Sequence, residues 1–286
     1  MKKILVTGSG GFIGNFLFNF LKNKKNIKLF GTINELKNKN HNLKKILLTK
    51  KFIKKNIFKC DLSDVKKVKK IVKKIQPDVI YHFAAMTNHT LSEKKKRLCK
   101  KNNSKITNNI INCMDKQSKL IFLSTDKIYS RNPKTSNENT NHNPPGFLAK
   151  EKLKCEKIIK KKIKKHFILR LPIVHAKGEN KDYSTIDNFL FLLKKNKKIS
   201  VFNNVKRSFL KIDEFNKFLK KLIYSKNYGI YNVGSKVSSY SKRLELLCKK
   251  YSIPTKNIKN LKGNIEPLIQ NFDTKKLRKN FNIAFS

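Results

Sequence analysis

The sequence predicts an α/β fold, with a doubly wound parallel sheet, helices on both faces and a smaller α+β lobe toward the carboxyl end. Two observations carry this prediction. The first half of the chain alternates short apolar strands with amphipathic helices, which is the pattern of repeated β-α-β units. The first strand also runs directly into a glycine cluster, Gly8-Ser9-Gly10-Gly11, and a helix follows it.

The elements of the first half can be placed in order. Short apolar segments predict strands at 3–7, 27–33, 57–60, 79–83, 120–124 and 167–171. Apolar residues at helical spacing predict helices at 12–22, from Ser63 or Asp64 to about Ile75, at 103–114 and at 150–165. Residues 132–145 are rich in Asn, Pro, Ser and Thr and predict a loop. We expect two interleaved lobes in one compact unit, 1–171 and 172–286.

Composition sets the class of protein. The 286 residues are 38% hydrophobic, which is enough for a buried core. The net charge of +50 comes mostly from lysines spread along the whole chain, with abundant Asn and Ile. This spread favours codon bias and a solvated surface over a dedicated nucleic-acid site. No apolar run approaches the roughly 20 residues of a membrane helix, so we expect a cytoplasmic protein with no membrane and no specific nucleic-acid partner.

The cysteines give no metal or disulfide pattern. All five are far apart in sequence, and none is part of a CxxC pair: Cys60, Cys99, Cys113, Cys155 and Cys248. Their odd number and wide spacing predict reduced, mostly buried thiols and no metal site.

The segment from Thr7 to Gly14, TGSGGFIG, predicts a dinucleotide site. Glycines let the backbone turn sharply and approach a pyrophosphate closely. The start of the following helix offers N–H groups and the positive end of its dipole to the phosphates. The residues expected at the cofactor from this motif are Gly8, Gly10, Gly11, Phe12, Ile13 and Gly14.

Together with later segments, this spacing resembles the extended short-chain dehydrogenase/reductase (NAD-dependent epimerase/dehydratase) family. Its motifs are matched in order by CDL at 60–62, PDVIYHFAA at 77–85, STDKIY at 124–129, LRLP at 169–172, RSF at 207–209, GIYNVGS at 229–235 and DTKKL at 273–277. Asn103 matches a structural Asn of the family. The STDKIY segment looks most like that of dTDP-4-dehydrorhamnose reductases and related sugar-nucleotide enzymes.

The resemblance implies a Rossmann-type fold and an NAD(P)-dependent oxidoreductase or epimerase. Its substrate would be a nucleotide-linked sugar used in making a deoxysugar or a surface polysaccharide. Family analogy also suggests a homodimer. The further cofactor contacts it implies are Asp61, Leu62, Phe83, Ala84, Ala85, Lys152 and Pro172.

The choice between NAD and NADP stays open at the end of the second strand. Asn34 stands where NAD enzymes often carry an acid, Glu35 follows it, and lysines lie a few residues further on. For the substrate we expect contacts from Thr87, Asn88 and Arg207. The guanidinium of Arg207 suits the phosphates of a nucleotide sugar, and the alternative for it is a surface ion pair.

The family's catalytic pair is incomplete in this chain. Family members carry Tyr-x-x-x-Lys on one helix, where the lysine binds the nicotinamide ribose and the tyrosine exchanges a proton with the substrate. In the best register Lys152 takes the lysine position and Leu148 takes the tyrosine position, and no tyrosine of the chain has a lysine four residues later. Thr125 is expected to hold the substrate oxygen.

Two functions therefore stay open. One is an enzyme whose proton comes from elsewhere, and His82 and His175 are more simply explained as packed or solvent-facing residues. The other is a cofactor-binding protein of the same fold, impaired in catalysis, with a regulatory or binding role.

Overall fold

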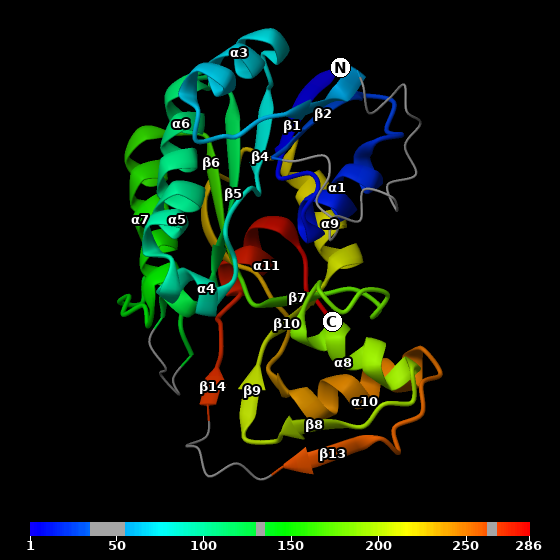
Figure 1. Cartoon of the computed structure of the whole chain (residues 1–286). Helices are drawn as coiled ribbons and strands as arrows, with labels where there is room; N and C mark the ends of the chain where they lie inside the picture. Colours follow the sequence, from blue (N-terminus) through cyan, green and yellow to red (C-terminus); the bar gives the residue numbers. More distant parts are fainter. Residues whose placement is uncertain (35–54, 130–134, 262–267) are drawn as a thin grey trace. The chain divides into compact units, whose positions relative to one another are not determined.

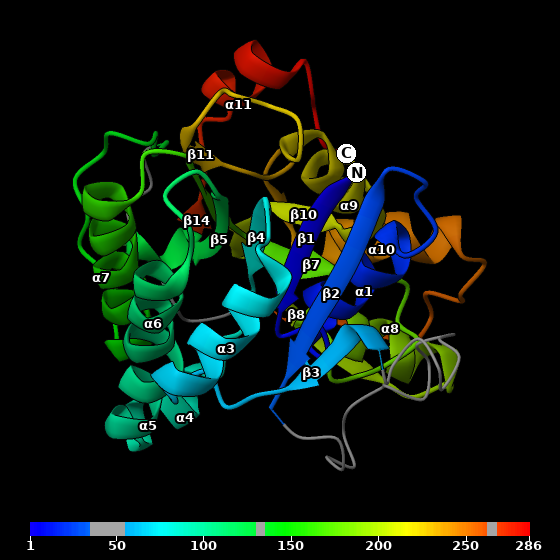
Figure 2. The ribbon, with the colours of Figure 1, turned by 90° about the horizontal axis from the view of Figure 1, so that it is seen from above.

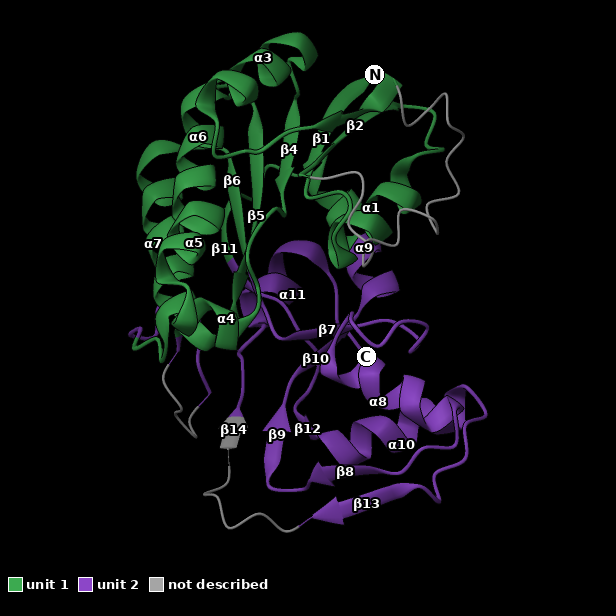
Figure 3. Cartoon of the chain, in the orientation of Figure 1, with its two compact units in different colours: residues 1–128, 143–169, 218–230 green, residues 129–142, 170–217, 231–286 purple. Residues whose placement is uncertain are grey.

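The computed structural model describes residues 1–34, 55–129, 135–261 and 268–286 (Figure 1). Backbone contacts divide the chain into two compact units (Figure 3). Unit 1 comprises 1–128, 143–169 and 218–230, and unit 2 comprises 129–142, 170–217 and 231–286. The units interleave along the sequence, and a lobe boundary at residue 171 stays a prediction.

Within the described part of the chain, the central sheet has seven parallel strands in the order β11-β6-β5-β4-β1-β2-β3. They are β1 (Lys2–Thr7), β2 (Ile27–Ile33), β3 (Ile57–Lys59), β4 (Val79–His82), β5 (Lys119–Thr125), β6 (His166–Leu171) and β11 (Gly229–Asn232). The strand order reverses at β1, which pairs with β2 on one side and β4 on the other. This confirms the doubly wound fold and places a switch point, where such folds bind ligands, at the carboxyl end of β1.

Helices cover both faces of this sheet (Figures 1 and 2). Helices α3, α6 and α7 lie side by side on one face, and α1 packs on the other against β1 and β2. The helices of unit 1 are α1 (Phe12–Leu21), α3 (Val65–Ile75), α4 (His89–Lys94), α5 (Lys96–Lys100), α6 (Ile106–Cys113) and α7 (Phe147–Lys162). A π-helical turn at Lys101–Lys105 joins α5 to α6, and a 3₁₀ turn at Asp126–Ile128 follows β5.

Several predicted ends shift by a few residues. The helix expected at 103–114 begins with the π-helical turn, and the strand expected at 57–60 ends at Lys59. The helix expected at 150–165 runs from 147 to 162, so Leu148 lies in its first turn. Of the two expected caps for α3, Asp64 is the one that accepts the N–H groups of the first turn.

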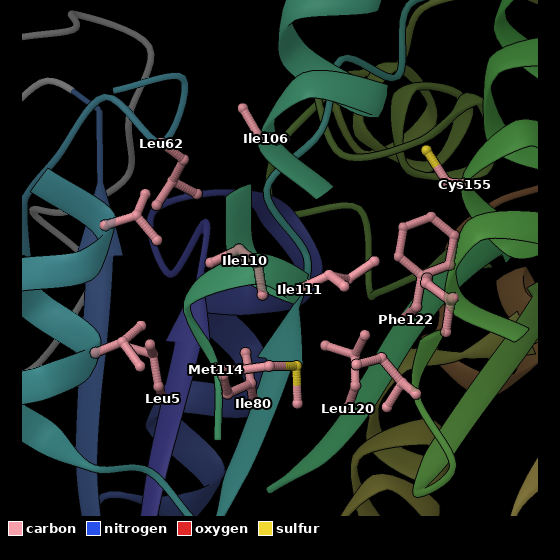
Figure 4. Packing of buried hydrophobic residues seen from close by; sticks show 14 of the residues in the cluster. Leu5, Leu62, Ile80, Ile106, Ile110, Ile111, Met114, Leu120, Phe122 and Cys155 are labelled. Atoms are coloured by element: carbon pink, nitrogen blue, oxygen red, sulfur yellow. The ribbon is translucent and has the colours of Figure 1, made fainter. Parts of the chain in front are cut away.

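The core of unit 1 lies between the sheet and the layer of α3, α6 and α7 (Figure 4). Leu5, Ile80 and Leu120 from the strands meet Ile110 and Ile111 from α6, and all five are buried. Burial of each such side chain contributes about 1.5–3 kcal/mol, so this contact fixes the strand ends that carry the cavity described below.

Unit 2 contains short strands and helices around a second core. Its elements are β7 (Ile173–His175), α8 (Thr185–Lys194), β8 (Ile199–Phe202), β9 (Val205–Arg207), β10 (Phe209–Lys211), β12 (Ser238–Ser239), α10 (Tyr240–Lys250), β13 (Ile258–Leu261), β14 (Leu268–Gln270) and α11 (Lys275–Phe281). Helix α9 (Ile212–Leu222) begins in unit 2 and ends in unit 1. Leu190 of α8, Phe209 of β10 and Leu244 of α10 are buried together in this core.

Two findings concern the cysteines and the described helices. The five cysteines are free thiols, and all except the partly exposed Cys113 are buried, as expected. Among the described helices, none has both the length and the apolar character needed to span a membrane.

Candidate functional site

A cavity of about 230 Å³ opens where the first strands of the sheet end, in unit 1. It lies at the carboxyl ends of β1 to β4 and includes the switch point at β1. The predicted cofactor residues that line it are Gly8, Gly10, Gly11, Asn34, Asp61, Leu62, Phe83, Ala84 and Ala85. Residues from four separate stretches of sequence thus come together where a doubly wound sheet binds ligands.

The glycines are required by close backbone packing. Gly8 has φ +67°, and a Cβ there would lie 2.8 Å from the backbone of Ala84. A Cβ on Gly14 would lie 2.2 Å from the carbonyl oxygen of Gly8. Helix α1 begins directly after Gly11, so its positive end faces this turn. Only glycine at these positions lets strand, turn and helix come this close.

A buried hydrogen-bond chain supports the wall of the cavity. The Oγ1 of Thr7 accepts the N–H groups of Phe83 (3.1 Å) and Ala84 (3.2 Å). Its own hydrogen is then donated to Nδ1 of His82 (2.9 Å), whose Nε2 donates to Oγ1 of Thr107 (3.0 Å). Burial, with a smaller effect of the Lys152 charge, lowers the pKa of His82 to about 3. His82 is thus a neutral, packed residue that positions the cavity wall.

The lining of the cavity also includes one acidic residue, Asp61. Burial raises the pKa of Asp61, but hydrogen bonds from Ser63 and from Lys101 outweigh burial and lower it to about 2. The Lys101 Nζ lies 3.0 Å from Asp61 Oδ2. Cys60 beside it has a pKa raised to about 11, first by burial and then by the charge of Asp61. Asp61 is therefore a fixed anion in the cavity, and the thiol of Cys60 stays protonated.

The sequence pattern missed part of the lining, namely Thr32, Ile33, Cys60, Asn102 and Ile106. The Oγ1 of Thr32 is buried, and among the described residues it has no hydrogen-bond partner. Such a group costs about 1–3 kcal/mol unless a ligand supplies the partner. Asn102 lies in the π-helical turn, a distortion that often marks functional sites. The glycine cradle and the Thr32 hydroxyl both fit a bound dinucleotide.

Helix α7 presents a buried face at the position of the expected catalytic pair. Leu148 is 4% exposed and packs with Met86 and Cys99, and Leu91 and Phe147 lie against this cluster. A leucine in this apolar setting has no proton to exchange. The position of the family's tyrosine is therefore occupied by a leucine that packs in an apolar cluster.

Lys152 and Thr125 make their hydrogen bonds within unit 1 and do not line the cavity. Lys152 is buried, its Nζ donates to the carbonyl oxygen of Leu123 (2.9 Å), and it lies 4.7 Å from the centre of the Phe122 ring. Burial lowers the pKa of Lys152. Thr125 Oγ1 donates to Asp126 (3.2 Å). Their catalytic roles stay predictions.

The other predicted residues lie in several places. Phe12, Ile13 and Gly14 form the first turn of α1, next to the cavity but outside its lining. Asn88 caps α4 by accepting the N–H of Leu91 (2.8 Å), and Thr87 precedes it.

In unit 2, Pro172 follows β6. Arg207 is buried and donates to Gln270 Oε1 (2.7 Å), a contact with an amide. His175 is buried and accepts a hydrogen bond from Arg243 (2.8 Å), in keeping with a packed residue. Substrate contacts at Thr87, Asn88 and Arg207, and a cofactor contact at Pro172, stay predictions.

Comparison with known structures places the fold. A dTDP-4-dehydrorhamnose reductase from Bacillus anthracis, solved in complex with NADP, is 22% identical with a TM-score of 0.81, covering 99% of this chain and 93% of that one. A UDP-glucose 4-epimerase from Thermotoga maritima, solved with UDP-glucose, is 17% identical with a TM-score of 0.82, covering 99% and 94%.

Two curated proteins are similar in sequence. A dTDP-D-glucose 4,6-dehydratase from Dictyostelium discoideum is 29% identical over 263 residues, which are 82% of this chain and 58% of that protein. A UDP-glucose 4-epimerase from Mycoplasma genitalium is 32% identical over 134 residues, 45% of this chain and 37% of that protein. The chain thus spans between about a third and three fifths of the length of these relatives.

A family model also matches. The NAD dependent epimerase/dehydratase family model matches residues 4–234, which include the glycine turn, the cavity and helix α7. The chain belongs to the NAD-dependent epimerase/dehydratase family.

Proposed function

We propose that this chain binds NAD or NADP in the cavity of unit 1 and acts on a nucleotide-linked sugar as an oxidoreductase or epimerase. The observation that supports this best is the lining of the cavity. It combines a glycine turn at a helix start with a buried Thr32 hydroxyl that lacks a partner among the described residues. Relatives named as acting on dTDP- and UDP-linked sugars support the substrate class.

The residues that would hold the cofactor follow from the cavity. The backbone at Gly8, Gly10 and Gly11 would receive the pyrophosphate, and Asp61 would accept hydrogen bonds as a fixed anion. Thr32 would gain the partner that its hydroxyl lacks. Bound there, the nicotinamide supplies hydride transfer. Thr125 would hold the sugar oxygen, and Lys152 would hold the cofactor.

One observation favours a second candidate, a cofactor-binding protein impaired in catalysis. Leu148 occupies the tyrosine position inside an apolar cluster, and Lys152 has a backbone partner of its own. Losing a positioned proton donor lowers a rate by about 10²- to 10⁴-fold. Cofactor binding with very slow or absent hydride transfer would fit this candidate.

Calorimetry tests the cofactor site first. NADH and NADPH are titrated at about 150 mM salt, where attraction to distant surface charges is screened. Gly11→Asp places a carboxylate at the turn and should abolish binding. Asn23→Asp is the matched control, since it adds the same charge at an exposed turn after α1 and should leave binding unchanged. If both variants bound the nucleotide with equal affinity, the cavity would not be the cofactor site.

Hydride transfer with a panel of nucleotide sugars then separates the two candidates. Thr125→Ala and Lys152→Ala should lower the rate if the chain is an enzyme, and each result counts only if the variant still folds and binds the nucleotide. Leu148→Tyr should raise it about 10²-fold or more, whereas Leu148→Phe, which adds the ring without the hydroxyl, should not. An inert wild type together with an inert Leu148→Tyr variant that still binds the nucleotide would reject the enzyme and leave the cofactor-binding role.

A further inference from the structure

Helix α7 separates its charged residues between two faces. Its two acids, Glu151 and Glu156, are buried and bonded to Ser104 and Ser124. Its outer face is lined by exposed lysines in a single stripe, Lys150, Lys154, Lys157 and Lys161. Residues at positions i, i+4, i+7 and i+11 lie on one side of a helix, so no acid interrupts this stripe.

The neighbouring segment extends the same charge. Helix α7 packs beside α4, α5 and α6 within unit 1. The exposed cations of the adjoining stretch are Lys94, Lys95, Lys96, Arg97, Lys100, Lys101 and Lys105. Glu93 is the exposed acid of α4, and its carboxylate accepts the N–H of Phe147 at the start of α7. Lysines and one arginine are therefore the main exposed charged side chains of α7 and of the neighbouring segment, where Lys101 is paired with Asp61.

We propose that this surface, the outer face of α7 with the adjoining α5, binds single-stranded nucleic acid through its phosphate backbone and without sequence preference. Successive lysines of the stripe are separated by about 6, 4.5 and 6 Å along the helix axis, at 1.5 Å per residue. This spacing suits a linear array of phosphates along an extended strand. Lysine acts as a point charge toward phosphate, and the four-residue stripe of α7 holds no arginine or aromatic side chain that would read a base. The adjoining α5 adds one arginine, Arg97, and Phe147 at the start of α7 lies beneath Lys96 and Lys100.

An anionic membrane fits the surface less well. A helix that lies in a membrane interface needs a broad apolar face toward the lipid. The apolar face of α7 is turned inward instead, with Ile159 and Cys155 buried in the core of unit 1. Leu98 is the one large apolar side chain of α5 that is substantially exposed, at 37%.

Matched charge removal separates this surface from the general charge of the chain. One variant carries Lys150→Gln, Lys154→Gln, Lys157→Gln and Lys161→Gln. The control carries Lys22→Gln, Lys24→Gln, Lys25→Gln and Lys28→Gln, around the turn between α1 and β2 on the opposite side of the sheet. Both lose four charges, so their long-range electrostatics change alike. Binding of a fluorescein-labelled oligouridylate is followed by anisotropy from low salt to about 150 mM.

We expect the α7 variant to lose at least tenfold in affinity at about 150 mM salt, and its slope of log K against log salt to fall by about 3, near 0.7 for each lysine lost. The control should lose no more than about twofold. Thermal unfolding checks that both variants fold, and Lys154→Gln with Lys161→Gln alone should give about half the change in slope if the full variant does not fold.

Three results would overturn the proposal. The first is an equal loss of affinity in the two variants, because the charge of the whole chain would then explain binding. The second is no binding by the wild type at about 150 mM salt. The third is binding to phosphatidylserine vesicles that is as tight as binding to the oligouridylate and equally sensitive to the α7 variant, because the surface would then be a membrane contact.

Discussion

The buried imidazole of His82 makes the stability of the fold sensitive to mild acid. Nδ1 accepts the hydroxyl hydrogen of Thr7, whose oxygen already accepts the N–H groups of Phe83 and Ala84. A proton on Nδ1 would turn this acceptor into a donor facing an oxygen with no free lone pair. Protonation therefore costs a hydrogen bond at the cavity wall in addition to the burial of a charge.

The magnitude follows from the pKa values. Burial lowers the pKa of His82 from 6.5 to about 3, so between these values the unfolded chain binds more protons than the folded chain. The stabilisation by neutral His82 is complete above pH 6.5 and is lost as the pH falls toward 3. From pH 7 to pH 5 the loss is about 2 kcal/mol, at about 1.4 kcal/mol per pKa unit. His175, whose pKa burial lowers to about 4, adds a similar amount.

Urea unfolding followed by circular dichroism at pH 7, 6 and 5 measures this effect. The wild type should lose about 4 kcal/mol of unfolding free energy over this range, and His82→Asn only about 2 kcal/mol. Asn offers an oxygen to the Thr7 hydroxyl but does not titrate. His175→Asn is the parallel variant, and it too should lose only about 2 kcal/mol of unfolding free energy between pH 7 and pH 5. A His82→Asn protein that loses stability as steeply as the wild type would show that His82 is not the group that titrates.

Three further predictions follow from single contacts. Gly14→Ala puts a methyl group 2.2 Å from the carbonyl oxygen of Gly8. The variant should have a lower midpoint of thermal unfolding and a lower affinity for NADH, measured by calorimetry. Unchanged NADH binding would argue against the tight turn. Lys119→Met removes three hydrogen bonds of 2.7–2.8 Å to carbonyls at the end of α9 and should cost about 3 kcal/mol in urea unfolding, against near zero for the exposed Lys116→Met. The carboxylate of Asp187 accepts three hydrogen bonds from the backbone N–H groups of Ala176 and Gly178. Asp187→Asn weakens them and should lower the free energy of unfolding by about 2 kcal/mol. An unchanged midpoint of thermal unfolding would contradict this prediction.

The fold could be predicted because its signal is local and repeated. Each strand of the first half is a short apolar run, and each crossover helix has an apolar face, so the parallel sheet follows from spacing. Helix starts were harder. The side chain of Asp64 caps the start of α3, and an Asp before an apolar pattern can be recognised in the sequence. Helix α7 begins after Gly146 and has no side-chain cap. Helix α1 also lacks a side-chain cap, but the glycine motif before it marks its start at Phe12, whereas no such motif precedes α7 and its predicted start fell three residues late.

The candidate site was predictable only where its residues form a motif. The glycine turn is a motif because its geometry requires glycine at fixed positions. Thr32 and Asn102 line the cavity from within a strand and a π-helical turn, and nothing in their neighbours distinguishes them from structural residues. They reach the cavity through the strand order around β1, which is a property of the sheet and not of any short segment.

Helix α7 shows why a retained lysine is weak support for retained catalysis. A spacing of four places residues 148 and 152 on the same face of the helix. In this chain each has a structural role of its own, because Leu148 packs against Met86 and Cys99 while Lys152 bonds to the Leu123 carbonyl. Replacing a buried lysine leaves that carbonyl without a partner, so the fold alone would select for lysine. Loss of activity in Lys152→Ala would therefore not distinguish an enzyme from a destabilised protein. The gain in rate of Leu148→Tyr over Leu148→Phe does, because a hydroxyl added to a folded, cofactor-binding chain changes the proton supply and little else.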